Sequence, residues 1–363
     1  MTVADIPEIP VLDFELYQPD DLDKQETTKQ LLKQLYDTMH DIGFFYIRGH
    51  GVPLSLTQAA FKSTSEFFDL PLNEKAKIAM ANSPHYRGYT RLNGETTDYK
   101  QDNRETLDLG REYPEGPLDA PAYTHLRGPN QWPEKLPTFK PTILQLLESM
   151  HQVGVRVLRA MAQSLGINVA EFMDMFGEDL GMRMKLVYYP GMDDKANVPL
   201  DHGIGVGPHK DYGFLALLLQ DNIGGLQVQL LDGRWIDAKP IEGTFVVNIG
   251  EIFEKLTRKR FIATTHRVLN SKNQSRYSIP LFLAPHINCH IPELDKFFPD
   301  STGSNRRLEH KSDVSEDQLL QGDIYGENEF KGYRRSHVKV TRKWYYFDEE
   351  QQQWHRRATP LVD

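Results

Sequence analysis

The stretch GIGVGPHKDYGFLALLLQ, residues 203–220, contains the pattern that decides the fold. Its second half, Phe214 to Gln220, is a nearly continuous apolar run with the length of a buried strand. Its first half is rich in glycine and carries His209-Lys210-Asp211 shortly before that run. Side chains two residues apart on an extended segment point to one side, so His209 and Asp211 can both reach one ion. The stretch therefore predicts a metal site in a glycine-rich loop next to a buried strand.

Four further segments have the character of strands. Residues 226–230 alternate apolar and polar side chains, which is the pattern of a half-buried strand. The other three are short apolar or alternating runs at residues 183–189, 244–249 and 276–283. Glycine and asparagine separate these runs, and short strands with such punctuation indicate a sandwich, a jelly roll or a barrel.

Two long helices are predicted outside this strand region. Apolar residues recur at steps of three and four from about 25 to 42, and again from Pro141 to Gly166, so each helix has one buried face. Residues 82–136, rich in Gly, Pro, Asn and charge, are interpreted as mostly irregular surface. The charged C-terminal region ends in an aromatic segment, residues 344–347, which we expect to pack on the body as a surface helix or strand.

His266 is the best candidate for a third metal ligand. It lies between two predicted strands, and together with His209 and Asp211 it completes a set of two histidines and one carboxylate. Such a set leaves three positions of iron(II) open, enough for a bidentate oxoacid and oxygen. A zinc site would usually close its shell or keep a single water. The alternative interpretation is that these are surface histidines in polar loops, because His-x-acid tripeptides also arise by chance.

Ten residues after His266, Arg276 and Ser278 would project from the same face of a strand. A guanidinium fork beside a hydroxyl suits a carboxylate, since arginine forms a bidentate charge-assisted pair. The alternative is an ordinary salt-bridged arginine on the surface of a sheet.

Composition narrows the setting in which the protein works. The 363 residues carry a net charge of −9, which argues against a general affinity for nucleic acid or anionic membranes. A single cysteine fits a reducing compartment. We see neither a targeting segment nor an apolar run near the roughly 20 residues of a membrane-spanning helix. We therefore expect a cytoplasmic monomer or weak homo-oligomer that binds neither nucleic acid nor membranes.

The order His209, Asp211, His266, Arg276, Ser278 resembles that of the isopenicillin N synthase-like family of iron(II)/2-oxoglutarate-dependent dioxygenases. The resemblance covers roughly residues 9–290 and extends to residues 322–333. Further motifs that resemble the family are Gly224-Gly225-Leu226-Gln227-Val228, Asn248-Ile249-Gly250-Glu251, residues 43–53 and Arg87-Gly88-Tyr89.

The resemblance implies an α+β protein whose mostly β core is a distorted double-stranded β-helix, or jelly roll, with flanking helices. It divides the chain into an N-terminal region (1–135), helical support (136–180), the iron and 2-oxoglutarate core (181–290) and a C-terminal segment packed on that core (291–363), all in one globular unit.

The resemblance also implies chemistry: Fe(II) as cofactor, 2-oxoglutarate as cosubstrate and ascorbate as a candidate reductant. His209, Asp211 and His266 would bind the iron. The protein would hydroxylate, desaturate or cyclise a small molecule with O2, releasing succinate and carbon dioxide.

The cosubstrate carboxylate would bind to Arg276 and Ser278, with Tyr189 adding a hydrogen bond. One departure is Val187, where the family often has asparagine, so one polar contact to the cosubstrate would be missing.

Two residues are considered for the substrate, each with a structural alternative. Arg87 either binds an acidic substrate group or anchors residues 82–110, and Phe253 either lines the pocket or belongs to the core. His202, in a glycine-rich stretch, is expected to face solvent.

Two other functions remain open at this point. One is an iron oxidase of the same fold that uses no 2-oxoglutarate, in which Arg276 and Ser278 bind the substrate's own carboxylate. The other is a non-catalytic jelly-roll binding protein, because a fold alone does not establish a function.

Overall fold

The computed structural model describes residues 8–97, 100–177, 179–191, 203–291, 297 and 323–362. Its core contains an eight-stranded sheet with the order β1-β2-β12-β9-β14-β7-β6-β3, in which only the β1–β2 pair is parallel. The strands are β1 (Val11–Asp13), β2 (Phe44–Arg48), β3 (Gly88–Thr90), β6 (Glu105–Gly110), β7 (Gly181–Tyr189), β9 (Leu215–Gln220), β12 (Phe245–Ile249) and β14 (Arg276–Ala284).

A second, four-stranded antiparallel sheet has the order β11-β10-β13-β8. Its strands are β8 (Ile204–His209), β10 (Leu226–Gln229), β11 (Trp235–Asp237) and β13 (His266–Leu269). Side chains from both sheets line one cavity, so the sheets enclose it as the two layers of a distorted jelly roll. Two hairpins lie outside them: β4 (Thr96–Thr97) with β5 (Lys100–Gln101), and β15 (Tyr345–Asp348) with β16 (Gln353–Arg356).

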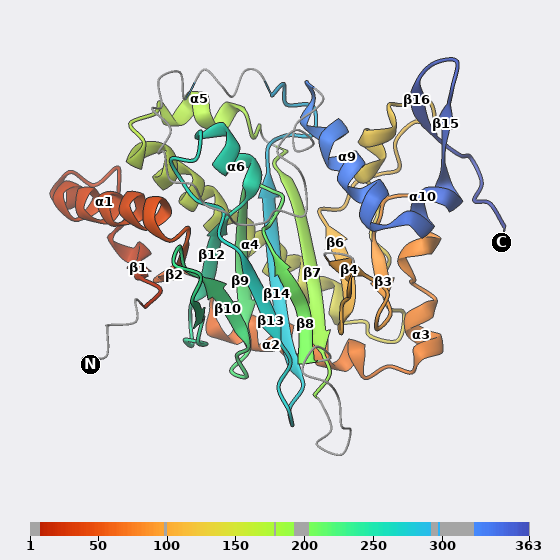
Figure 1. The fold of residues 1–363 in the computed structure, drawn as a ribbon, viewed down its shortest axis with the longest axis horizontal. Coiled ribbons are helices and arrows are strands. Elements are labelled where there is room, and N and C mark those ends of the chain that lie inside the picture. The colour runs from red at the N-terminus through yellow and green to blue at the C-terminus, as the bar shows by residue number, and fades with distance from the viewer. Residues whose placement is uncertain are drawn as a thin grey trace.

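Helices flank this β core, as expected for the α+β class (Figure 1). The longer ones are α1 (Gln25–Asp41), α2 (Leu54–Phe68), α4 (Phe139–Ser164) and α9 (Tyr325–Ser336). The shorter ones are α3 (Leu72–Ala76), α5 (Val169–Asp174), α6 (Glu251–Leu256) and α10 (Val338–Trp344). Within the described part of the chain, no helix has the length and apolar character needed to cross a bilayer.

Helix α4 packs directly on the large sheet and also contacts α1 and α2. Its apolar face is buried as the periodicity predicts, and Gly154 brings the helix close to β14. A Cβ at Gly154 would lie only 2.1 Å from a methyl carbon of Leu283, so a larger residue would require this side chain or the helix to move. The helix begins at Phe139 rather than after Pro141, because proline is tolerated in the first turn of a helix.

The prediction that residues 82–136 are mostly irregular surface is wrong for β6. This strand pairs with β7 along its whole length and is buried inside the large sheet. Its polar residue Asp108 is 1% exposed and accepts a hydrogen bond of 2.7 Å from the Nε of Arg183. A buried carboxylate requires such a partner, and the partner lies 75 residues away in the sequence. The local pattern therefore resembled a surface segment.

The C-terminal aromatic segment packs on the body, as predicted. It spans the end of α10 and the start of β15. The indole of Trp344 donates to the Ala81 carbonyl at 3.0 Å, and the Tyr345 hydroxyl donates to the Pro84 carbonyl at 2.7 Å. These bonds attach the last hairpin to the N-terminal part of the chain.

Candidate metal centre and its cavity

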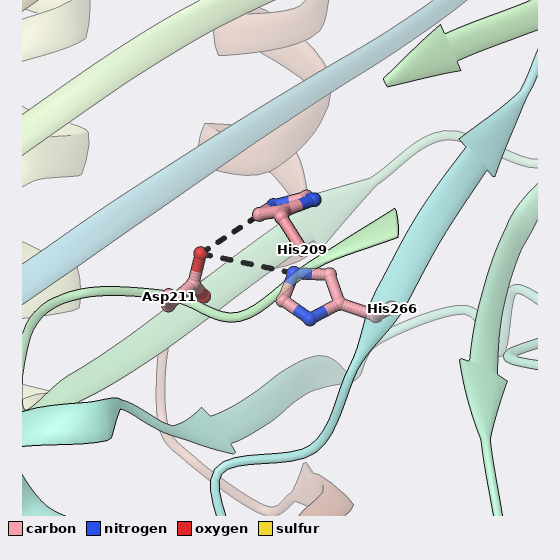
Figure 2. Close-up of side chains that lie close together, drawn as sticks. All are labelled: His209, Asp211 and His266. Carbon is pink, nitrogen blue, oxygen red and sulfur yellow. Dashed lines mark ion pairs between the residues drawn. The ribbon is translucent and has the colours of Figure 1, made fainter. Parts of the chain in front are cut away.

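Strand pairing brings His209 and His266 together. They are direct neighbours across the β8–β13 pair, and their ring centroids are 4.3 Å apart. Asp211 follows β8 in a short loop and points between the two rings (Figure 2). Its Oδ1 lies 3.7 Å from the Nε2 of His209 and 3.7 Å from the Nε2 of His266. One potential ligand atom from each residue thus lies within 4.8 Å of the others.

Hydrogen bonds fix the orientation of both histidine rings. The Nδ1 of His209 lies 2.8 Å from the Gly207 carbonyl, and the Nδ1 of His266 lies 3.1 Å from the Thr264 carbonyl. A carbonyl only accepts, so each Nδ1 carries the proton and donates it. Each Nε2 is then left with a lone pair directed at the space beside Asp211.

Asp211 is oriented from the opposite sheet. The side-chain amide of Asn248, on β12, donates to its Oδ2 at 2.7 Å, which leaves Oδ1 for an ion. The Asp211 carbonyl accepts from the backbone N–H of Glu251 at 2.8 Å. A Cβ at Gly250 would lie 2.0 Å from the Gly213 carbonyl oxygen, so this close approach needs glycine. The Asn-Ile-Gly-Glu motif therefore holds the aspartate-bearing loop in place.

The protonation state of the site suits a metal. Burial, and next the neighbouring His266, lowers the pKa of His209 to about 3. His209 is therefore neutral at physiological pH, as a metal ligand must be. Two imidazoles and one carboxylate form a facial set that suits iron(II) and leaves positions for other ligands.

Arg276 lies in the same cavity and lacks partners for its charge. The side chain is 1% exposed, and its Nε and Nη1 have no hydrogen-bond partner among the described residues. Its Nη2 has a single long contact, 3.5 Å to the amide oxygen of Gln220. Ser278, two residues along β14, is also buried and lines the cavity. A buried guanidinium with unused donors is costly unless an anion binds to it.

Tyr189 supports Arg276 through its ring. The two residues are neighbours on β7 and β14, and the guanidinium carbon lies 4.9 Å from the ring centroid. Gly205 on β8 also packs closely on this ring, because a Cβ there would lie 2.6 Å from the Tyr189 ring. The predicted glycine-rich loop is therefore a strand, in which glycine allows close packing.

The Tyr189 hydroxyl has a protein partner, Arg104. Burial lowers the pKa of the Arg104 guanidinium, but the neighbouring Glu95, Asp102 and this hydroxyl raise that pKa by more. Val187, where a polar contact was expected to be missing, is buried, lines the cavity and lies opposite Ser278.

The cavity extends from the triad to helix α9 and has a volume of about 360 Å³. Six residues of α9 form its far wall: Tyr325, Glu329, Gly332, Tyr333, Arg335 and Ser336. Their spacing of three and four places them on one face of the helix. Sequence reasoning did not identify this wall, because α9 is rich in charge and resembles a surface helix.

The two residues considered for the substrate lie elsewhere. Arg87 is buried outside this cavity and donates to the side chain of Asn130 at 2.8 Å and to the Arg111 carbonyl at 3.1 Å. Phe253 is fully buried between Phe214 and Phe261 and does not line the cavity. These contacts favour the structural alternative for both residues, since neither lines the cavity that contains the triad, although Arg87 lines a smaller cavity that meets it. His202 lies outside the described residues.

The chain matches two family models. Residues 9–135 match the model described as non-haem dioxygenase in morphine synthesis N-terminal, and residues 181–285 match the 2OG-Fe(II) oxygenase superfamily. Both spans contribute strands to the large sheet.

Curated relatives match nearly the whole chain. The 2-oxoglutarate-dependent dioxygenase frbJ of Dothideomycetidae sp. is 34% identical over 94% of this chain and 93% of its own length. The homoarginine-6-hydroxylase 2-ODD-C23 of Glycine max is 32% identical over 90% of this chain and 96% of its own.

Solved structures share the fold and contain the expected small molecules. A full-length Neurospora crassa protein in complex with alpha-KG and 5-formyluracil has a TM-score of 0.72 and 25% identity, covering 93% of this chain and 100% of that one. JOX2 in complex with 2OG, Fe and JA has a TM-score of 0.63 and 30% identity, covering 78% of this chain and 76% of that one.

Proposed function

This chain belongs to the 2OG-Fe(II) oxygenase superfamily, and from that premise we propose which of its residues serve the reaction. It is an iron(II)- and 2-oxoglutarate-dependent dioxygenase that oxidises a small molecule. The bound iron and 2-oxoglutarate, with O2, supply the oxidising chemistry and release succinate and carbon dioxide.

His209, Asp211 and His266 hold the iron in this proposal. This proposal rests mainly on one observation: two Nε2 lone pairs and the Asp211 Oδ1 converge at the wall of the cavity. The same cavity also contains Arg276. The donor set fits iron(II), and Asn248 keeps the second carboxylate oxygen engaged.

Arg276 and Ser278 bind the distal carboxylate of 2-oxoglutarate. Arg276 has unused donors at Nε and Nη1 and only one long contact at Nη2, so its guanidinium can present two parallel N–H groups to a carboxylate, and the Ser278 hydroxyl lies on the same face. Tyr189 serves the cosubstrate mainly by packing its ring on Arg276, which keeps the guanidinium in position. Apolar side chains of both sheets, such as Leu218 and Val268, exclude water from the space between the two sites.

Dependence on 2-oxoglutarate tests this function. Purified protein with iron(II) and ascorbate, a proposed reductant, should convert added 2-oxoglutarate to succinate and consume O2. Substrate oxidation that needs no 2-oxoglutarate would instead favour the iron oxidase of the same fold. Protein that binds iron but neither consumes O2 nor forms succinate would favour the non-catalytic alternative.

We also propose the setting in which the protein acts. The net charge of −9 and the single cysteine support a cytoplasmic enzyme that does not bind nucleic acid. The large sheet takes strands from residues 1–135 and from residues 181–290, which supports one globular unit acting as a monomer or weak homo-oligomer.

The names of the similar proteins do not agree on a substrate. One relative is named a homoarginine-6-hydroxylase, one structure contains 5-formyluracil and another contains JA. The substrate class of this chain must therefore be inferred from the residues that line its own cavity.

A further inference from the structure

Most charged side chains at the far end of the cavity pair with one another. Glu95 lies 2.6 Å from the Nζ of Lys185 and 2.8 Å from Arg104. Arg183 pairs with Asp108, which does not itself line the cavity. Because the charges in these ion pairs neutralise each other within the protein, they interact only weakly with a charged substrate.

Glu329 on α9 is different. Three acidic residues line the cavity among those that the structure describes: Glu95, Asp211 and Glu329. Glu95 forms ion pairs with Lys185 and Arg104, and Asp211 accepts a hydrogen bond from Asn248. Glu329, in contrast, has neither an ion pair nor a hydrogen bond to any described residue. It is only partly exposed and lies where the large cavity meets a smaller one beside Arg87.

The surroundings of Glu329 are aromatic. Tyr212, Tyr325 and Tyr333 all line the cavity, and the charge of Glu329 contributes to raising the pKa of Tyr325 and of Tyr333, with burial as the larger cause for both. Burial also raises the pKa of Glu329 itself, although the charges of Arg183, Arg127 and Arg87 oppose this shift without pairing with the carboxylate. A carboxylate in such surroundings is stabilised most when a cation arrives, and the faces of tyrosine rings also attract cations.

We propose that the prime substrate carries a cationic nitrogen group, an ammonium or a guanidinium, and that Glu329 binds this group between tyrosine rings. The inference rests on the proposed function, because it assigns the substrate class to the same cavity. Glu329 is thus a specificity-determining residue that anchors the charged end of the substrate. The remaining part of the substrate extends toward the triad past Tyr212, the neighbour of Asp211.

Binding to the protein loaded with iron(II) and 2-oxoglutarate, measured by anaerobic calorimetry, tests this proposal. The probes are three pairs of similar length that differ in charge: L-arginine and L-citrulline, L-homoarginine and L-homocitrulline, and L-lysine and L-norleucine. At least one cationic member should bind at least about tenfold more tightly than its neutral partner, since a hydrogen bond to a charged group is worth that much. Equal affinities within all three pairs, or no binding by any cationic probe, would overturn the proposal.

Variants on the same helix locate the effect. Glu329→Gln should remove the preference for the cationic probe, and Glu329→Asp, which keeps the charge, should retain it. Glu327→Gln is the matched control, because Glu327 is exposed and does not line the cavity. A preference that survives in Glu329→Gln would overturn the assignment.

Succinate formed by the wild-type protein from 2-oxoglutarate and O2 without any probe, with ascorbate supplying the two electrons that a substrate would otherwise give, tests the proposed function separately. Its absence would count against the proposed function, while the binding preference would still decide the role of Glu329.

Discussion

The iron end of the cavity is built from paired strands, whereas the far end is walled by one helix. His209 and His266 face each other across β8 and β13, and each ring is held by the backbone carbonyl two residues before it. Glu329 and the tyrosines at the far end belong largely to α9, in a part of the chain that the family models do not match.

The difference separates two tasks. Strand register fixes the positions of the iron ligands independently of the substrate, so the chemistry does not depend on α9. A helix wall can change residue by residue while the sheets keep their pairing. The iron end should therefore respond to substitution with loss of all activity, and the far end with a change of substrate.

Removing a ligand of the triad should have the largest effect. His209→Ala, Asp211→Ala or His266→Ala should each reduce succinate formation more than about a hundredfold, because two remaining ligands do not hold iron(II) in the required geometry. Bound iron and succinate are measured together, with circular dichroism to verify folding. His40→Ala, a change on the outer helix α1, is the control. A variant with near wild-type turnover at ordinary iron levels would remove its residue from the site.

Arg276→Ala should come next, and its effect should fall on the cosubstrate. Losing one partner of a buried charge pair costs about 2–5 kcal/mol, so the affinity for 2-oxoglutarate should fall at least about tenfold. Iron binding should change much less, and Arg276→Lys should restore affinity only in part, since lysine lacks the planar fork. Arg267→Ala, on β13 of the four-stranded sheet and against Trp235, serves as the control. Weakened binding of the prime substrate without any need for 2-oxoglutarate would instead indicate the oxidase.

Substitutions of Tyr189 distinguish a contact of its hydroxyl with the cosubstrate from a contact of its ring with Arg276. Its ring packs on Arg276 and its hydroxyl interacts with Arg104, so Tyr189→Phe should raise the KM for 2-oxoglutarate by less than about threefold. Tyr189→Leu removes the ring and should raise this KM by about threefold to tenfold. A tenfold rise already in Tyr189→Phe would show that the hydroxyl itself contacts the cosubstrate, as the sequence suggested.

The smallest expected effect is a dependence of stability on pH at the α9 side. Burial lowers the pKa of His85 from 6.5 to about 4, although its hydrogen bond to the His125 carbonyl opposes the shift. Between these values the unfolded chain binds more protons than the folded one, so stability falls as the pH drops through this window. His85→Asn should reduce the loss of unfolding free energy between pH 7 and pH 5 by about 1–2 kcal/mol.

Urea denaturation at the two pH values measures this change, with His40→Asn as the surface control. An unchanged pH dependence in His85→Asn would mean that other groups cause the acid sensitivity.

The sequence predicted what depends on local pattern. The strands around the triad follow from alternation and apolar runs, and the triad itself from one tripeptide and one distal histidine. Arg276 was found because its spacing to Ser278 places both on one face of a strand.

What the sequence did not predict depends on partners far along the chain. Strand β6 contains a buried aspartate whose cation lies on β7, so its burial was not visible locally. Arg87 is satisfied by Asn130 and by a backbone carbonyl, contacts that only the folded chain creates. The α9 wall was missed because its exposed face carries most of the charge.

Gly332 gives the wall of the cavity one further property. It lies within α9, where alanine would stabilise a helix by roughly 1 kcal/mol more than glycine. A Cβ at this position would meet nothing within 4 Å, so the extra methyl group would extend into open space on the cavity side. The helix is thus intrinsically less stable than it would be with alanine, and the cavity keeps room for a larger substrate. Replacing Gly332 with alanine, valine or leucine should then progressively lower the size limit for molecules that the cavity can bind. The alanine variant should also be more stable to heat than the wild-type protein.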